Sequence, residues 1–272
     1  METLHRIHEL LSDAGLLRHQ RNYERATAKA EEALRISESS ERKIEPKEAA
    51  EIHMELGNIY FCDHLYAEAE IQFQKAVSLI EQQFYPSHPN LIPILDHLVR
   101  LYISLERFED AQQVCYRLLD IMKMALLGSD CWYIETVRMT AVVEMKLGNY
   151  KEAESLISKV LPIVDSSTIG PSEEFFWLLA KIKEATGEPE AREHYERAIK
   201  IFDSGRGIGN RRTRCMMDYA NYLQSSGEDD RGYAIRTRAL ALQESQCSED
   251  MVDDLPNSKD YQRVPYPTTI LH

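Results

Sequence analysis

The chain contains 272 residues and carries a formal net charge of -13. Such acidity argues against non-specific binding to nucleic acid or to an anionic membrane, because either surface attracts an excess of Lys and Arg. The sequence has no run of alternating β-branched residues, which favours helices throughout and predicts an all-α fold.

The N-terminal segment and the cysteines bear on the compartment. Residues 1–17 place charges among their apolar positions and have no uninterrupted apolar stretch, so we expect neither a signal peptide nor a membrane span. The five cysteines are an odd number and form no CxxC pair, which predicts reduced thiols. Together these features predict a cytoplasmic protein.

Helical hairpins are predicted along most of the chain, because apolar and small residues recur at helical spacing on both sides of a series of short breaks. The hairpins form a predicted array over residues 1–244 and cover about residues 7–37, 50–81, 92–122, 134–165, 173–202 and 213–243. Residues 245–272 are polar and acidic and contain three prolines, so we expect this C-terminal tail to be disordered by itself.

The hairpin at residues 50–81 has the clearest pattern. Large and small residues share the facing sides of its two helices, at Leu56, Gly57, Tyr60, Ala69, Phe73 and Ala76. Counted from Ala50, these residues fall on positions 7, 8, 11, 20, 24 and 27, a pattern that resembles the tetratricopeptide repeat.

The spacing between hairpins is longer than in the minimal form of that repeat. Ala69, Ala111 and Ala153 follow one another at intervals of 42 residues, against 34 in the minimal repeat. With the proline-containing loop at residues 86–90, this enlarged repeat resembles the kinesin light chain type over residues 50–165. The resemblance implies a right-handed superhelical solenoid of about six hairpins.

A stack of such hairpins has a concave groove lined by the first helix of each hairpin, and we expect a partner to bind there. In this register, positions 2, 5, 9 and 12 of each first helix face the groove. The predicted groove residues are Met54, Asn58, Phe61, Asp96, Arg100, Ile103, Arg138, Val142, Met145, Phe176, Arg214 and Asn221. The polar members are expected to hydrogen-bond the backbone or acidic side chains of a bound segment, and the apolar members to receive its apolar side chains.

The sequence shows no motif typical of catalysis or of metal binding. His5 and His8 lie one helical turn apart, but no acidic residue or cysteine stands at a fixed spacing to them as a further ligand. The GxSxG nucleophile motif and the GxxxxGKS phosphate loop are absent. We therefore expect a protein that is not an enzyme and that holds no metal or cofactor.

The predicted function is that of a scaffold or adaptor whose groove binds a peptide segment or a partner protein. One alternative is a regulatory sensor, in which the groove binds a signalling peptide and modulates a partner enzyme or regulator; another is a hydrolase or transferase with an unrecognised site. Self-association through the C-terminal tail is a further hypothesis. In it, four apolar residues of the tail dock in extended form, on the last hairpin or on a neighbouring copy: Val264, Tyr266, Ile270 and Leu271.

Overall fold

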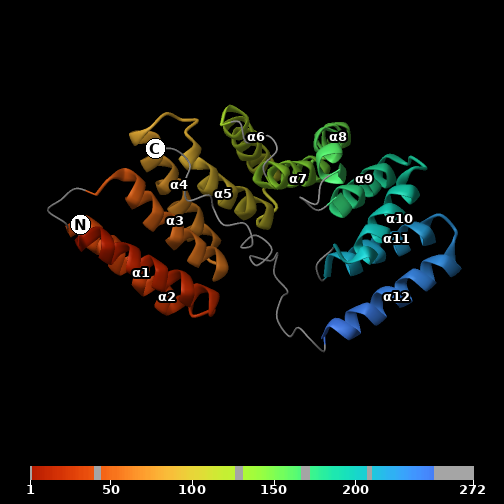
Figure 1. Cartoon of the computed structure of the whole chain (residues 1–272), viewed down its shortest axis with the longest axis horizontal. Coiled ribbons are helices and arrows are strands. Elements are labelled where there is room, and N and C mark those ends of the chain that lie inside the picture. The colour runs from red at the N-terminus through yellow and green to blue at the C-terminus, as the bar shows by residue number, and fades with distance from the viewer. Residues whose placement is uncertain (1, 40–43, 126–130, 167–171, 207–209, 248–272) are drawn as a thin grey trace. The chain divides into compact units, whose positions relative to one another are not determined.

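A computed structural model describes residues 2–39, 44–125, 131–166, 172–206 and 210–247 of the chain (Figure 1). These described residues form helices joined by turns and contain no strand, so the fold is the predicted all-α repeat solenoid. The chain divides into two compact units, Met1–Gly128 (unit 1) and Ser129–His272 (unit 2). The last helix continues to Cys247, and the rest of the predicted tail lies outside the described residues.

Unit 1 consists of three helical hairpins. In each hairpin, two consecutive helices pack along one another. The pairs are α1 (Glu2–His19) with α2 (Tyr23–Ser39), α3 (Pro46–Cys62) with α4 (Tyr66–Gln83), and α5 (Ile92–Ser104) with α6 (Phe108–Met124). A short 3-10 helix, η1 (Pro89–Leu91), leads into α5. Pro46 suits the start of α3, because the first residue of a helix has no helical hydrogen bond to lose.

Unit 2 has the same organisation. Its hairpins are α7 (Cys131–Lys146) with α8 (Tyr150–Ser166), α9 (Ser172–Thr186) with α10 (Ala191–Ile201), and α11 (Asn210–Ser225) with α12 (Asp229–Cys247). The short segment η2 (Phe202–Arg206) follows α10. The helices of unit 2 follow one another in chain order from green to blue in Figure 1.

Each of the six described hairpins turns at a residue with positive φ that lies one or two positions after the end of its first helix. These residues are Arg21, His64, Glu106, Gly148, Gly187 and Gly227. The next amide bonds back to the first helix; for example, the Leu65 amide donates to the Tyr60 carbonyl over 2.8 Å. This is the six-residue hydrogen bond of a Schellman motif, which ends a helix and reverses the chain. Counted from the predicted repeat starts, the positive-φ residue is always position 15, so the hairpins share one register.

Small residues allow the two helices of a hairpin to approach closely. Ala69, Ala111 and Ala153 are fully buried, as the sequence predicted. Neighbouring hairpins also share a core, since one cluster of buried residues draws on α1, α2 and α3: Ile7, Leu10, Ala14, Ala26, Ala30, Ala33, Ile52, Leu56 and Ile59. The first hairpin therefore depends on the second for part of its burial, as is usual in repeat proteins.

The first helices of neighbouring hairpins contact one another within each unit: α1 with α3, α3 with α5, and α7 with α9 through their backbones, and α9 with α11 through side-chain pairs. We call the row α1, α3 and α5 the first-helix face of unit 1, and the row α7, α9 and α11 the first-helix face of unit 2. All twelve predicted groove residues belong to helices of these two rows.

Candidate functional site

Ion pairs join α1 to α3 on the first-helix face of unit 1. Arg18 Nε donates to Glu55 Oε1 over 2.9 Å, and both side chains are largely buried. Towards the other end of these two helices, His8 Nε2 of α1 lies 3.9 Å from Glu51 Oε2 of α3. In the shared register His8 and Arg18 occupy positions 2 and 12 of the first repeat, so α1 contributes to this face as well. His8 and Arg18 are not among the predicted groove residues, which begin with the second repeat.

The middle of this face combines apolar and amide side chains. Met54, Asn58 and Phe61 of α3 are all partly exposed, and so is Ile103 of α5. The Phe61 ring lies 5.8 Å from the ring of Tyr66, which opens the next helix. Partly exposed apolar groups beside an amide can receive both the side chains and the backbone of another chain.

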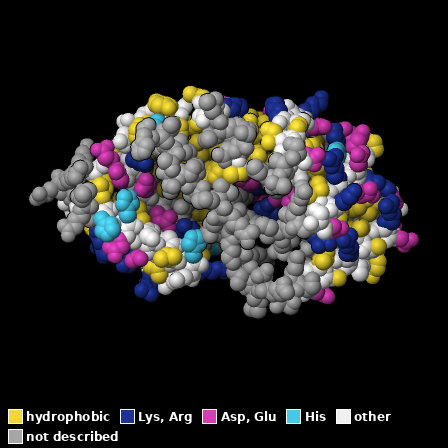
Figure 2. Space-filling view, in the orientation of Figure 1, with side chains coloured by type: hydrophobic (Ala, Val, Ile, Leu, Met, Phe, Trp, Pro, Cys, Tyr) yellow, Lys and Arg dark blue, Asp and Glu magenta, His cyan; other side chains and the backbone are white. Residues whose placement is uncertain are grey.

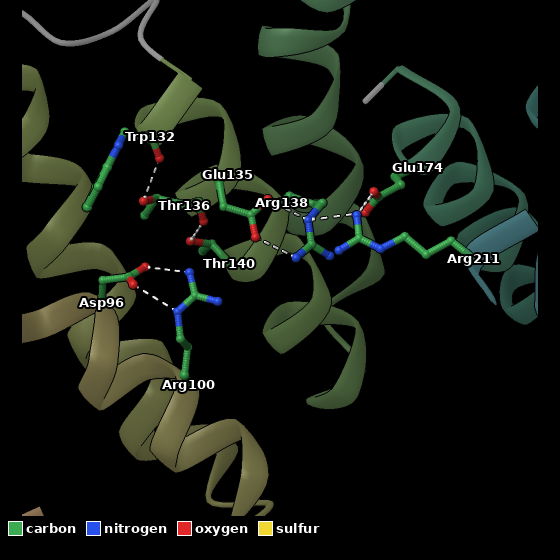
Figure 3. A network of polar contacts seen from close by, with 9 residues as sticks. All are labelled: Asp96, Arg100, Trp132, Glu135, Thr136, Arg138, Thr140, Glu174 and Arg211. Carbon is green, nitrogen blue, oxygen red and sulfur yellow. Dashed lines mark hydrogen bonds and ion pairs between the residues drawn. The ribbon is translucent and has the colours of Figure 1, made fainter. Parts of the chain in front are cut away.

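Asp96 and Arg100 form a two-point ion pair one turn apart on α5 (Figure 3). Arg100 donates from Nε to Asp96 Oδ2 over 2.8 Å and from Nη2 to Oδ1 over 3.1 Å. Asp96 is buried, and this pairing compensates the loss of water around its carboxylate. Arg100 thus donates to a carboxylate of its own helix. The sequence had predicted that its guanidinium would hydrogen-bond a bound segment.

His97 follows Asp96 and points the other way, into the core of unit 1. Its ring stacks on that of Phe73 with centroids 5.4 Å apart. Burial lowers the pKa of His97 from 6.5 to about 4, and the charge of Asp96 only partly offsets this effect. The imidazole is consequently neutral at physiological pH.

A chain of charges crosses all three helices of the first-helix face of unit 2 (Figure 3). Arg138 of α7 donates to both carboxylate oxygens of Glu135, over 2.8 Å and 2.6 Å. Its Nε also lies 3.4 Å from Oε2 of Glu174 on α9, and Glu174 pairs in turn with Arg211 of α11. The side chain of Glu174 is only 6 % exposed, so its charge depends on these two guanidinium groups.

The face continues at Trp177 and Lys181 of α9, which are not among the predicted groove residues. Trp177 Nε1 donates to Oδ2 of Asp218 on α11 over 3.0 Å, and Lys181 Nζ lies 3.1 Å from the same oxygen. These residues are positions 5 and 9 of the fifth repeat counted from Glu173. Phe176, the predicted groove residue of this repeat, lies in the interior at 2 % exposure, with Arg197 over its ring.

The remaining predicted residues of unit 2 lie on α7 and α11. Val142 and Met145 are partly exposed, and Arg214 and Asn221 are exposed. Asn221 accepts a hydrogen bond from Arg236 of α12 over 2.7 Å. Arg214 is therefore the most accessible cationic residue of the predicted set.

The surface charges are mixed. Figure 2 shows basic and acidic side chains interspersed on the face in view, without a large area of one sign. Within the described ranges, no group of three or more His, Cys, Asp or Glu residues is arranged to hold a metal ion. Of the helices described, none combines the length and the apolar character needed to cross a membrane.

Part of the chain matches a known protein family. A family model for the tetratricopeptide repeat matches residues 48–124. A search of curated protein sequences found no match. The family match therefore covers the second and third hairpins, and the described residues as a whole form a helical repeat solenoid.

Solved structures of similar fold include repeat proteins of the kinesin light chain type. BtubC (BKLC) from P. vanneervenii is 15% identical with a TM-score of 0.68 over 76% of this chain and 84% of its own. TPR-like repeats of Podosopora anserina, described as those of a kinesin light chain, are 18% identical with a TM-score of 0.60 over 76% of this chain and 99% of their own. YrrB, described as a TPR protein with an unusual peptide-binding site, is 21% identical with a TM-score of 0.52 over 71% of this chain and 84% of its own. Residues 48–124 are thus similar to tetratricopeptide repeats, and the fold of the chain resembles that of repeat proteins of the kinesin light chain type.

Proposed function

We propose that this protein is a cytoplasmic scaffold or adaptor, without catalytic activity, whose first-helix faces bind a peptide segment or a partner protein. The observation that supports the proposal most is the middle of the unit 1 face. There Met54, Phe61 and Ile103 are partly exposed beside the amide of Asn58. The similar fold of YrrB, described as having a peptide-binding site, supports the same use of this architecture.

The chemistry of this surface suits an extended segment with apolar side chains. An amide side chain both donates and accepts, so Asn58 can pair with a backbone peptide group of any sequence. The apolar groups around it then select the side chains of the segment. The ion pairs Arg18–Glu55 and Asp96–Arg100 flank this surface. Because each charged side chain is held by its partner, the charges beside the surface have defined positions. In this proposal they orient the partner more than they bind it.

The test is a paired variant on each side of the same hairpin. A partner is first isolated by affinity purification and mass spectrometry and then titrated by calorimetry. Met54→Ala with Asn58→Ala should weaken its binding at least about tenfold. The matched control is Ile71→Ala with Lys75→Ala on the exposed side of α4, which should leave the affinity unchanged. Equal affinity of both variants, with unchanged melting, would move the site away from this face.

A further inference from the structure

The outer side of α12 carries apolar residues at places that are covered in earlier hairpins. In the second helices of several earlier hairpins, the residue directly after the buried small residue contacts the next hairpin. Glu70, after Ala69, accepts from the Tyr102 hydroxyl of the next hairpin over 3.0 Å. Glu154, after Ala153, lies 2.8 Å from Lys183 of the next hairpin.

The same place in the fifth hairpin also contacts its successor. Arg192, which follows the buried Ala191, pairs with Glu228 of the last hairpin. In α12 the small residue is Gly232, and the residue after it is Tyr233, whose side chain is 69 % exposed. This position therefore faces the next element of a solenoid, and here it holds a large aromatic residue in water.

Leu240, two turns further along α12, is also exposed where its counterpart in an earlier hairpin is covered. Its counterpart in α10 is Ile199, eight residues after the buried Ala191, just as Leu240 lies eight residues after Gly232. Ile199 is 6 % exposed and lies beside residues of α11, whereas Leu240 is 46 % exposed. Tyr233, Thr237 and Leu240 share one stripe of α12, since Thr237 follows Tyr233 by four residues and Leu240 follows Thr237 by three.

The stripe is too small for a stable dimer interface. It has two large apolar side chains on a helix of 19 residues, whereas stable interfaces bury about 800 Å² on each partner. A segment of the same chain needs far less contact, because tethering raises its local concentration to roughly the millimolar range. The chain continues from Cys247 for 25 residues, enough to turn back along the whole helix.

The sequence of that segment matches a narrow apolar stripe. Val264, Tyr266 and Ile270 are separated by even intervals, so an extended chain presents them on one side. Pro265 and Pro267 disfavour a helix there. We propose that residues 256–272 dock in extended form along the outer side of α12, with these apolar side chains against Tyr233 and Leu240. The segment then acts as the cap of the solenoid, independently of what the first-helix faces bind.

Hydrogen exchange with mass spectrometry tests this proposal on the full chain and three variants, while light scattering records the mass. The first variant lacks residues 256–272, the second is Ile270→Asp, and the third is Thr269→Asp, which adds the same charge on the opposite side of the extended segment. Truncation and Ile270→Asp should speed exchange of the α12 amides at least about tenfold, with Thr269→Asp like the wild type and all proteins monomeric.

Three results would overturn the proposal. Unchanged exchange after truncation would show that the segment does not contact α12. Equal acceleration by Thr269→Asp and Ile270→Asp would show a general effect of charge rather than a docked side. A doubled mass, with α12 protection that rises with protein concentration, would assign the stripe to a second copy of the chain.

Discussion

Gly57 on α3 lies directly against the aromatic ring of Phe73 on α4. A methyl group added at Gly57 would come within 2.5 Å of Phe73 Cε1, and Phe73 is 1 % exposed with no free space to retreat. Alanine favours a helix over glycine by about 1 kcal/mol, but overpacking a core costs about 1–3 kcal/mol. We expect Gly57→Ala to destabilise unit 1 in urea unfolding.

Gly15 provides the matched control for this close contact. It lies inside α1, and the nearest atom to an added Cβ is Glu55 Oε1 at 3.8 Å, an ordinary contact distance. Gly15→Ala should therefore stabilise the protein by up to about 1 kcal/mol through helix propensity alone. If the two alanine variants shift the unfolding midpoint in the same direction, the steric explanation for Gly57 is wrong.

Ala111 offers a second test of how closely the hairpin helices pack. It is fully buried on α6, so leucine has no room without displacing the neighbouring helix. Ala111→Leu should cost about 1–3 kcal/mol. The control is Ala67→Leu on the exposed side of α4, where the change should stay within about 0.5 kcal/mol. A melting temperature of Ala111→Leu equal to that of the wild type would contradict the repeat register.

The hairpin turns predict opposite effects for two reciprocal substitutions. Glu106 has a φ of 56°, a region that costs an L-residue about 1–2 kcal/mol, partly offset by the greater freedom of glycine in the unfolded chain. Glu106→Gly should thus stabilise unit 1 by about 0.5 kcal/mol. Gly148 has a φ of 79° with nothing within 4 Å of an added Cβ. Gly148→Ala should cost about 1 kcal/mol from backbone strain alone, and thermal melts of the two variants should move in opposite directions.

The hairpins could be predicted from the sequence because the residues that form them lie close together in the chain. The small residues at Ala69, Ala111 and Ala153 recur at a fixed interval, and each packs against a helix only a few residues away in the chain. The fifth hairpin was harder, because its second helix has the buried Ala191 one residue closer to the turn than in the other hairpins. With the register of this hairpin less clear, the buried Phe176 was predicted as a groove residue and Trp177 was not.

The charges of the candidate site were less predictable than the helices. Glu174 precedes Arg211 by 37 residues and follows Arg138 by 36, so their meeting depends on how three hairpins pack. No helical spacing rule links side chains that far apart in sequence. The pair Asp96 and Arg100 is different, since a spacing of four residues on one helix indicates the contact directly.

The neutral state of His97 predicts a dependence of stability on pH. The unfolded chain binds a proton near the ordinary pKa of 6.5, whereas the folded protein binds it only near its lowered pKa of about 4. Between these values the unfolded state holds more protons, so stability falls as the pH decreases from about 6.5 to about 4. The loss should reach about 1–3 kcal/mol, because the partly exposed ring loses only part of its hydration on folding.

His97→Gln separates this effect from the carboxylates that titrate over the same range. The variant should lose less stability than the wild type between pH 6.5 and pH 4 in urea titrations, because glutamine takes up no proton. Parallel stability curves for the two proteins would show that His97 is protonated equally in the folded and unfolded states.

Arg138 is expected to matter for folding, which separates it from an exposed binding residue. The sequence alone predicts that replacing Arg100 and Arg138 together by Ala would weaken partner binding and leave the helix content unchanged, because exposed charges contribute little to folding. In the structure the side chain of Arg138 is 14 % exposed and lies beside the buried carboxylate of Glu174. Arg138→Ala should destabilise unit 2 by about 1–3 kcal/mol, less than for a sole partner because Arg211 still pairs with Glu174.

Arg214 is the control for a cation on the same face, since it is exposed on α11. Arg214→Ala should change the unfolding free energy by no more than about 0.5 kcal/mol. A double-mutant cycle with Glu174→Ala then measures the coupling, because removing both partners leaves no buried carboxylate unpaired at this point. If Arg138→Ala unfolds at the same urea concentration as Arg214→Ala, the Glu174 pair adds nothing to stability, and Arg138 becomes a candidate for partner binding alone.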